Sequence, residues 1–333
     1  MKARTMMRSV MAALLLGTTA TACASTTATT PSSTTAPPPA TIRPPDPASV
    51  AANELGSVPI LMYHRVENDP ASEYDQTPAK FTAELDRLYR EGYRPTTLAH
   101  YITGTMDLAA GTHPVVLTFD DSTTTQLALT ATGDPAPGCA VALLEDFATQ
   151  HPGFTATATF YVNNDPFADD PRALPWLARH GYEIGAHTAT HANLSTLDAA
   201  GVQREFVQNL RAIKTAVPDA PVRSMALPLG VYPRDHALAT GGSWDGTPYT
   251  FDSVLLVGAN PASSPYTAVD PAAIPRIRSG RSPVQFDSTY WLDYLAAHPD
   301  ERYTSDGDPT RISFPRALAP TLAPAKVPAA QPY

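Results

Sequence analysis

The chain has 333 residues, a formal net charge of −9 and only two cysteines. The negative charge argues against nucleic acid as a partner, and two cysteines cannot supply the disulfide framework of a small secreted scaffold. Between two compositionally biased ends, roughly 265 residues remain, which is enough for one large α/β domain.

The first 22 residues predict a cleaved signal peptide. Positive residues come first, an apolar stretch over 10–17 follows, and small residues precede Cys23. The apolar stretch is too short to cross a bilayer as a mature helix. The run Ala20-Thr21-Ala22-Cys23 resembles a bacterial lipobox, which implies lipidation of Cys23. A plain signal peptide with an incidental cysteine is the alternative.

The segments that flank the predicted domain are rich in proline and small residues. Residues 23–52 consist mostly of Ala, Thr, Ser and Pro, which predicts an extended linker that tethers the domain to the membrane. Residues 317–333 are rich in Pro and Ala, which predicts a disordered tail. We therefore expect a single catalytic domain over 53–316, located outside the cytoplasm as a membrane lipoprotein or a secreted protein.

Strand and helix signals alternate along the predicted domain. The predicted strands cover 58–63, 115–119, 157–162, 182–185, 225–227 and 254–257. The predicted helices begin at Thr77-Pro78, near 140, near 172 and near 197, the last with Ser195 or Thr196 as its cap. Repeated strand–helix units imply a parallel sheet or barrel, with active residues at the carboxyl ends of its strands.

Two acidic residues follow the predicted strand 115–119. Asp120 and Asp121 are neighbours, and because side chains alternate along a strand, the two cannot share one orientation. This suits a division of labour in which one carboxylate binds a metal and the other acts as a base. The alternative is that the pair only caps the following helix.

His187 and His191 form the second candidate pair. Histidines four residues apart lie on one face of a helical turn, close enough to share a metal ion. The spacing alone is weak, because the chain has nine histidines. The case for a metal site becomes stronger because the pair follows the predicted strand 182–185, as Asp121 follows another predicted strand. Two imidazoles and a carboxylate would leave positions open for water and substrate.

These motifs resemble those of the polysaccharide deacetylases with a NodB homology domain, carbohydrate esterase family four. The first motif of that family, TFDD, stands here at 118–121, and the second, H-[ST]-x-x-H, stands at 187–191. The segments 158–162 and 181–185 also match. The resemblance covers roughly residues 57–280.

The resemblance implies an α/β fold, a distorted (β/α) barrel of the NodB type. It also implies that Asp120 is the general base. Asp121, His187 and His191 would hold a divalent metal, usually zinc, although cobalt, nickel or manganese suits the same ligands.

The N-terminal segment of the predicted domain indicates which branch of this family the sequence resembles. Residues 59–64 are similar to the branch that includes bacterial poly-N-acetylglucosamine deacetylases. In that branch the motif order is permuted, and a histidine that ends an N-terminal strand supplies the general acid, a role that falls here to His64. A capped core histidine is the alternative for His64. His298 is the other late histidine, and its helix-like surroundings make it a poorer acid.

The sequence departs from the family pattern at two positions. Ser122 stands where the first motif usually continues with glycine, and Ala226 stands where the third motif usually has an arginine that orients the base. The permuted branch often lacks this arginine too. Arg276 is a candidate to orient Asp120 in its place, and a surface arginine is the alternative. Residues 122–153 form a long insertion that we expect to shape the substrate cleft.

Together, these features predict a metal-dependent hydrolase that removes acetyl groups from a polysaccharide such as peptidoglycan or poly-N-acetylglucosamine. N-acetyl groups of GlcNAc-type residues are the expected target, and O-acetyl esters are the alternative. A catalytically inactive lipoprotein that binds glycan with the same fold is the competing class. A glycosidase needs carboxylates on opposite sides of the scissile bond, and a serine hydrolase needs a GxSxG motif that this chain lacks.

Overall fold

The computed structural model describes residues 45–281 and 284–333. The predicted signal peptide, the lipidation candidate Cys23 and most of the predicted linker lie outside the described residues. Within the described part of the chain, none of the helices combines the length and the apolar character that a membrane crossing requires.

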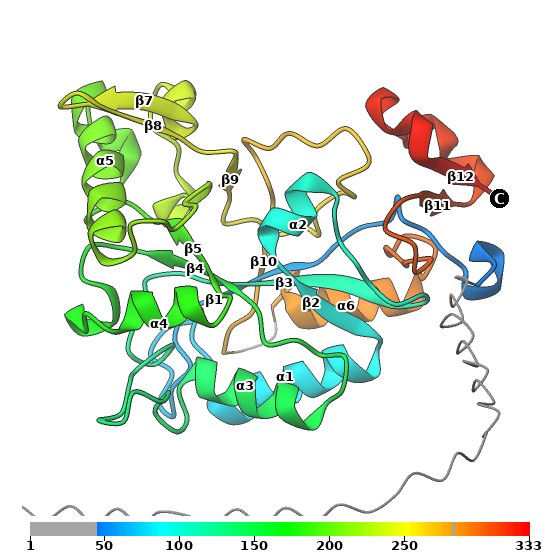
Figure 1. The fold of residues 1–333 in the computed structure, drawn as a ribbon, viewed down its shortest axis with the longest axis horizontal. Helices are drawn as coiled ribbons and strands as arrows, with labels where there is room; N and C mark the ends of the chain where they lie inside the picture. The colour runs from blue at the N-terminus through cyan, green and yellow to red at the C-terminus, as the bar shows by residue number, and fades with distance from the viewer. Residues whose placement is uncertain (1–44, 282–283) are drawn as a thin grey trace, which may run out of the picture. The chain divides into compact units, whose positions relative to one another are not determined.

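A sheet of eight parallel strands forms the centre of the domain (Figure 1). Its order is β10-β1-β3-β4-β5-β6-β9, and β2 pairs with the first half of β3. The strands are β1 (Ile60–Tyr63), β2 (Tyr93–Thr96), β3 (His113–Phe119), β4 (Thr159–Val162), β5 (Glu183–Ala186), β6 (Ser224–Ala226), β9 (Ser253–Leu255) and β10 (Ile277–Arg278). All six strands predicted from apolar runs are present, whereas the short β2 and β10 were not predicted.

The edge strands β9 and β10 approach each other without a regular ladder. Leu255 and Ile274 form an isolated parallel bridge, and Ala259 and Ile277 form an antiparallel one. The N–H of Leu256 donates to the carbonyl oxygen of Ile274 at 2.9 Å. The sheet therefore closes irregularly, and the predicted distorted (β/α) barrel is confirmed.

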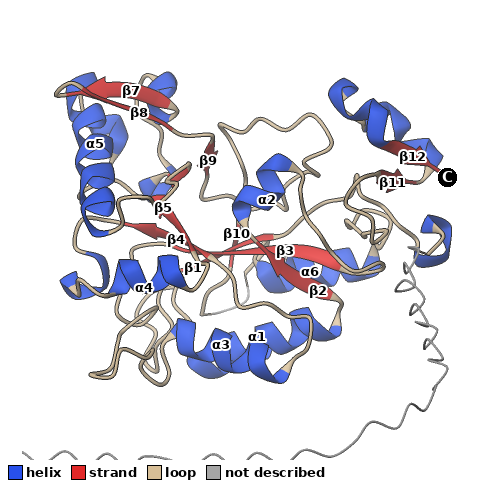
Figure 2. Ribbon diagram, in the orientation of Figure 1, coloured by secondary structure: helices blue, strands red, loops and turns tan. Residues whose placement is uncertain are grey.

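Helices cover the outside of this sheet (Figure 2). They are α1 (Pro78–Arg90), α2 (Leu98–Thr103), α3 (Ala140–Gln150), α4 (Ala173–Arg179), α5 (Ala199–Ala216) and α6 (Ser288–Ala297). Helices α1 and α3 pack side by side, and α5 carries an antiparallel hairpin of β7 (Gly241–Trp244) and β8 (Thr247–Thr250). Short 3-10 turns connect these elements: η1 (Pro47–Val50), η2 (Pro166–Asp169), η3 (Leu194–Thr196), η4 (Pro228–Gly230) and η5 (His236–Ala239).

Side-chain caps mark where helices α1 and α5 begin. The Thr77 hydroxyl accepts an N–H from the first turn of α1, as the sequence predicts. Helix α5 instead begins after Asp198, whose carboxylate accepts an N–H of the first turn at 2.7 Å. The predicted cap at Ser195 or Thr196 is wrong, because these two residues belong to the separate turn η3.

Packing of aromatic rings behind the strands determines which way the strand ends face. The Tyr63 ring stacks on Phe119 at 5.1 Å and meets Phe81 of α1 edge-on at 5.2 Å, so both strands present these rings to the helix layer. Successive side chains of a strand point to opposite faces. The next residues, His64 and Asp120, therefore point into the barrel.

The C-terminal residues are ordered, so the disordered tail predicted for 317–333 is wrong. Two 3-10 turns, η6 (Arg316–Thr321) and η7 (Pro324–Ala329), lead to β12 (Ala330–Pro332), which pairs in parallel with β11 (Ile312–Phe314). Proline-rich composition predicted disorder, but here the prolines fit 3-10 turns, and Leu318 and Leu322 pack against a buried cluster. The Tyr333 hydroxyl donates to the carbonyl oxygen of Ala52 at 2.7 Å. Ala52 is buried although the prediction placed it in the linker, so the fold begins before residue 53.

Candidate active site

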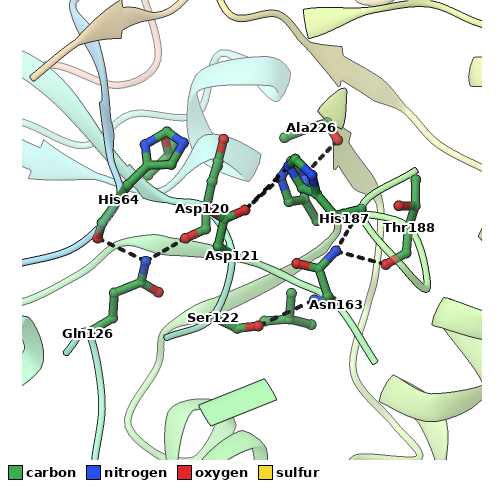
Figure 3. Close-up of polar contacts among 12 residues, drawn as sticks. His64, Asp120, Asp121, Ser122, Gln126, Asn163, His187, Thr188 and Ala226 are labelled. Atoms are coloured by element: carbon green, nitrogen blue, oxygen red, sulfur yellow. Dashed lines mark hydrogen bonds and ion pairs between the residues drawn. The ribbon is translucent and has the colours of Figure 1, made fainter. Parts of the chain in front are cut away.

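The candidate residues converge at one edge of the sheet. His64 follows β1, Asp120 and Asp121 follow β3, and His187 follows β5. Because the carboxyl ends of parallel strands lie at the same edge, three separate segments meet there. Figure 3 shows His64 on one side of the two aspartates and His187 on the other.

Asp121, His187 and His191 form a cluster that could hold a metal ion. One potential ligand atom from each residue lies within 4.8 Å of the other two. Oδ1 of Asp121 is 3.4 Å from Nε2 of His187 and 3.5 Å from Nε2 of His191. This Oδ1 is buried and has no hydrogen-bond partner among the described residues. A carboxylate oxygen that faces two imidazole nitrogens is a donor set suited to a divalent metal.

A main-chain carbonyl orients His187 within this cluster. Nδ1 of His187 lies 2.8 Å from the carbonyl oxygen of Ala226, the last residue of β6. A carbonyl oxygen can only accept, so Nδ1 carries the proton and Nε2 presents its lone pair toward Asp121. Burial opposes a charge on His187, but Asp120 and Asp121 outweigh this effect and raise its pKa. A metal ion and a proton therefore compete for Nε2.

A loop brings the two histidines together, so the helical turn predicted for them is wrong. Residues 187–193 contain no helix. Thr188 and His191 have left-handed φ angles of 64° and 55°, and these reversals return His191 to within 5.0 Å of His187 between ring centroids. For a residue other than glycine, such a conformation costs about 1–2 kcal/mol, so the loop needs support from its surroundings.

Two buried polar residues supply that support. Nδ2 of Asn163 donates to the carbonyl oxygens of His187 and Thr188, at 2.6 and 3.0 Å (Figure 3). The Glu205 carboxylate accepts the N–H of Thr190 at 2.9 Å and its hydroxyl at 3.1 Å. These contacts hold the main chain on both sides of the left-handed Thr188.

Asn209 of α5 adds a third support that the sequence interpretation missed, as it missed Asn163 and Glu205. Its side-chain oxygen accepts the N–H of His187 at 3.2 Å, and its amide donates to the carbonyl oxygen of Val162 at 2.9 Å. Asn163 directly follows β4, so the strand-end signal could have identified it. Glu205 and Asn209 are polar residues on the buried face of α5, and that position was the available signal for both.

Asp120 forms a buried, bidentate ion pair with Arg276. Nη1 and Nη2 donate to Oδ1 and Oδ2, each at 2.7 Å, and neither side chain is more than 1% exposed. Nε of Arg276 donates to the carbonyl oxygen of Leu256 at 2.9 Å, and Nη1 also lies 3.2 Å from Oγ1 of Thr118. The structure thus brings Arg276 to Asp120, and the alternative of a surface arginine is wrong.

The charges around Asp120 and His64 set their protonation in opposite directions. Burial disfavours ionisation of Asp120, but the positive charge of Arg276 and its hydrogen bonds outweigh burial and hold the pKa of Asp120 well below the usual range. Burial lowers the pKa of His64, although Asp120 and Asp121 oppose that shift. Asp120 is therefore ionised at neutral pH, whereas His64 is mainly neutral.

Both departures from the family pattern are accommodated. Ser122 has a left-handed φ of 48°, which explains why glycine is usual at this position. Its Oγ accepts the N–H of Asn163 at 3.3 Å, so the extra side chain is buried with a partner. At Ala226, the backbone contributes the contact with His187, and the missing arginine has a counterpart in Arg276.

Gln126, within the predicted insertion, links the two strand ends that carry the candidate catalytic residues. Its Nε2 donates to the carbonyl oxygen of His64 at 2.9 Å and also to that of Asp120 (Figure 3). With the amide reversed, Oε1 would face two acceptors, so the contacts themselves assign its orientation. No sequence pattern pointed to this residue. His298, the poorer acid candidate, lies exposed at the end of α6 and outside this site.

Comparison with known proteins places both motifs in one family. Residues 108–241 match the family described as polysaccharide deacetylase, a range that includes Asp120 to His191 but neither His64 nor Arg276. A chitooligosaccharide deacetylase of Bradyrhizobium sp. (strain ANU 289) is 36% identical over 131 residues, which cover 39% of this chain and 52% of that protein. The chitooligosaccharide deacetylase of Rhizobium leguminosarum bv. phaseoli is 30% identical over 132 residues, which cover 39% and 51%. The chain thus spans about half the length of these curated relatives.

Solved structures share the fold at lower identity. The Streptococcus pyogenes deacetylase PplD, in complex with acetate, superposes with a TM-score of 0.54 and 17% identity over 71% of this chain and 97% of that one. A polysaccharide deacetylase from Bacillus cereus gives a TM-score of 0.54 and 16% identity over 72% and 69%. At such identities the likeness concerns the fold alone.

Proposed function

We propose that this chain, which belongs to the polysaccharide deacetylase family through residues 108–241, removes N-acetyl groups from GlcNAc-type residues of a cell-wall or exported polysaccharide. The reaction would hydrolyse a linear amide to acetate and a free amine. The observation that carries the proposal is the position of the Asp120–Arg276 ion pair directly beside the Asp121, His187 and His191 cluster. Relatives named chitooligosaccharide deacetylases support an N-acetylated sugar as the substrate.

A divalent metal, for which we propose zinc, fits Asp121, His187 and His191. One carboxylate and two imidazoles are ligands that zinc favours, and the unpartnered Oδ1 of Asp121 supports the fit. Such an ion, when bound, would polarise the acetyl carbonyl and lower the pKa of a water molecule. Asn163, Glu205 and Asn209 hold the ligand loop in place.

The remaining chemistry would fall to Asp120, Arg276 and His64. Asp120 takes a proton from the water whose oxygen attacks the acetyl carbon. Arg276 keeps that carboxylate ionised and fixes its plane through two parallel hydrogen bonds. As the C–N bond breaks, His64 gives a proton to the leaving nitrogen. Because burial lowers the pKa of His64 more than Asp120 and Asp121 raise it, His64 would take up the proton that it donates during the reaction.

Metal content and acetate release together test this assignment. The substrate panel is chitin oligomers, poly-N-acetylglucosamine, peptidoglycan and acetylated xylan, each with and without a chelator. Asp120→Asn should retain the metal and lose turnover by about 10²–10⁴-fold, whereas His187→Ala should lose both. Full activity in Asp120→Asn would reject the base, and acetate release from xylan alone would reject the N-acetyl substrate.

We also propose that the protein is exported and anchored through lipid on Cys23. The support is the sequence of residues 1–52, with its signal-like start, its lipobox-like run and its proline-rich linker. Cys23→Ser should release the protein from the membrane fraction, and the mass of the mature wild type should include a diacylglyceryl group. An unmodified wild-type mass would reject the anchor.

A further inference from the structure

A stripe of aromatic rings lies on α6, outside the candidate active site. We name it the α6 stripe; it consists of Phe286, Tyr290, Trp291, Tyr294 and His298. Successive ring centroids lie 5.1, 5.2, 5.4 and 4.1 Å apart, so the rings form one continuous row. Phe286 and Tyr290 are 38% and 37% exposed, which is unusual for large apolar side chains within the described residues.

The side-chain polar atoms of Trp291 and Tyr294 are already paired within the chain. Nε1 of Trp291 donates to the carbonyl oxygen of Ala259 at 2.7 Å. The Tyr294 hydroxyl lies 2.9 and 3.0 Å from the two carboxylate oxygens of Glu301. The rings of Trp291 and Tyr294 are thereby held in place, and their faces and edges are what they can offer to a ligand. Such preorganised rings lose little conformational entropy on binding.

The stripe begins near the edge of the sheet that carries the active site and ends near the opposite edge, where the N–H of Ser57, before β1, donates to the carbonyl oxygen of Glu301 at 2.7 Å. Strand β10 ends beside β1, where the N–H of Ser279 donates to the carbonyl oxygen of Met62 at 3.0 Å, and α6 is the helix that follows. In a (β/α) barrel, the loop after a strand lies on the active-site face, so α6 begins at that face. Trp291 also contacts Ala259. Gly258, the residue before Ala259, packs on the main chain of Arg276.

The surroundings of the stripe favour a carbohydrate that carries free amines. Aromatic faces attract both apolar C–H surfaces, such as those of pyranose rings, and ammonium groups. The carboxylates of Asp300 and Glu301 lie at the end of the stripe, on a chain whose net charge is −9. Removal of N-acetyl groups from a glycan would create ammonium groups on neighbouring sugars, so the product matches this surface in charge.

We propose that the α6 stripe is a second glycan-binding site, which holds a partially deacetylated amino-sugar polymer next to the catalytic centre. This inference rests on the proposed function for the identity of the glycan. It predicts that the stripe contributes to binding of long chains and contributes nothing to short oligomers, which the catalytic centre alone accommodates.

The test compares polymer with trimer in the full-length protein. The probes are soluble, partially deacetylated chitin and chitotriose, with binding measured by calorimetry and turnover by acetate release. Phe286→Ser combined with Tyr290→Ser should weaken polymer binding and raise the polymer KM by about tenfold, and kcat/KM for the trimer should stay unchanged. Tyr290→Phe keeps the ring and should bind as wild type. Val327→Ser is the matched control, because Val327 is exposed but lies on η7.

Several results would overturn the inference. These are an unchanged polymer affinity in the double variant, an equal loss on polymer and trimer, or a loss of dimer in sedimentation, which would make the stripe a contact between two copies of the chain. The proposed function can fail independently of this inference. If the wild type releases no acetate while the double variant still loses polymer binding, the catalytic assignment is wrong and the glycan-binding site is supported.

Discussion

Replacement of Arg276 by methionine would leave Asp120 as a buried carboxylate without its cation. Removal of one partner of a buried ion pair costs about 3–5 kcal/mol. Loss of the contacts with Leu256 and Thr118 adds about 1 kcal/mol each. Because a native domain is stable by only about 5–15 kcal/mol, Arg276→Met should unfold at a much lower urea concentration than wild type. Loss of the group that orients this carboxylate should also lower kcat by about 100-fold or more.

Two further variants separate stability from catalysis. Arg276→Lys keeps the charge but cannot make two parallel hydrogen bonds, so it should be more stable than Arg276→Met and still slow. Asp120→Asn combined with Arg276→Met removes both charges, which should restore part of the stability and none of the turnover. The measurements are urea unfolding at pH 7 and acetate release. Wild-type values of both the urea midpoint and kcat in Arg276→Met would refute this reasoning.

Three other residues allow further predictions. Asn163→Ala removes the amide that holds the ligand loop and should weaken metal binding by about 10–100-fold, as measured by competition with a chromogenic chelator; an unchanged affinity would contradict this role. Gln126→Leu should lower kcat by about tenfold at unchanged metal affinity, because only the relative position of His64 and Asp120 changes; a parallel loss of metal would point instead to general disruption. Burial, with the charge of Arg302, lowers the pKa of His113 from 6.5 to about 4. The folded state therefore resists protonation, so the contribution of His113 to stability is complete above pH 6.5 and is lost as the pH falls toward 4. Between pH 7 and 4, the unfolding free energy of wild type should fall by up to about 3 kcal/mol more than that of His113→Gln, and parallel pH curves would contradict the shift.

Sequence patterns located the site because its residues follow apolar strands. The runs before His64, Asp120 and His187 are buried on both faces, so each is recognisable without knowledge of the tertiary structure. Parallel pairing then brings the strand ends to one edge. The fold class and the meeting of these residues were predictable for this reason.

Long-range pairing and unusual backbone angles were not predictable in the same way. The contact of Arg276 with Asp120 spans 156 residues and depends on β10 pairing beside β1. The proximity of His187 and His191 depends on a left-handed Thr188, which no local propensity favours. Spacing alone suggested a helical turn there, so the prediction identified the correct pair of histidines but gave their backbone the wrong conformation.

The ordered C-terminus has a consequence for how this domain folds. The contact between Tyr333 and Ala52 joins residues 281 positions apart, and the bond from the N–H of Ser313 to Glu54 joins residues 259 apart. Closing a loop of that length costs about 5 kcal/mol of chain entropy before any contact compensates it. The segment after β11 should therefore dock last and exchange its amide hydrogens first. In the nascent chain, the barrel and the edge that carries the candidate active site can assemble while the final residues are still free.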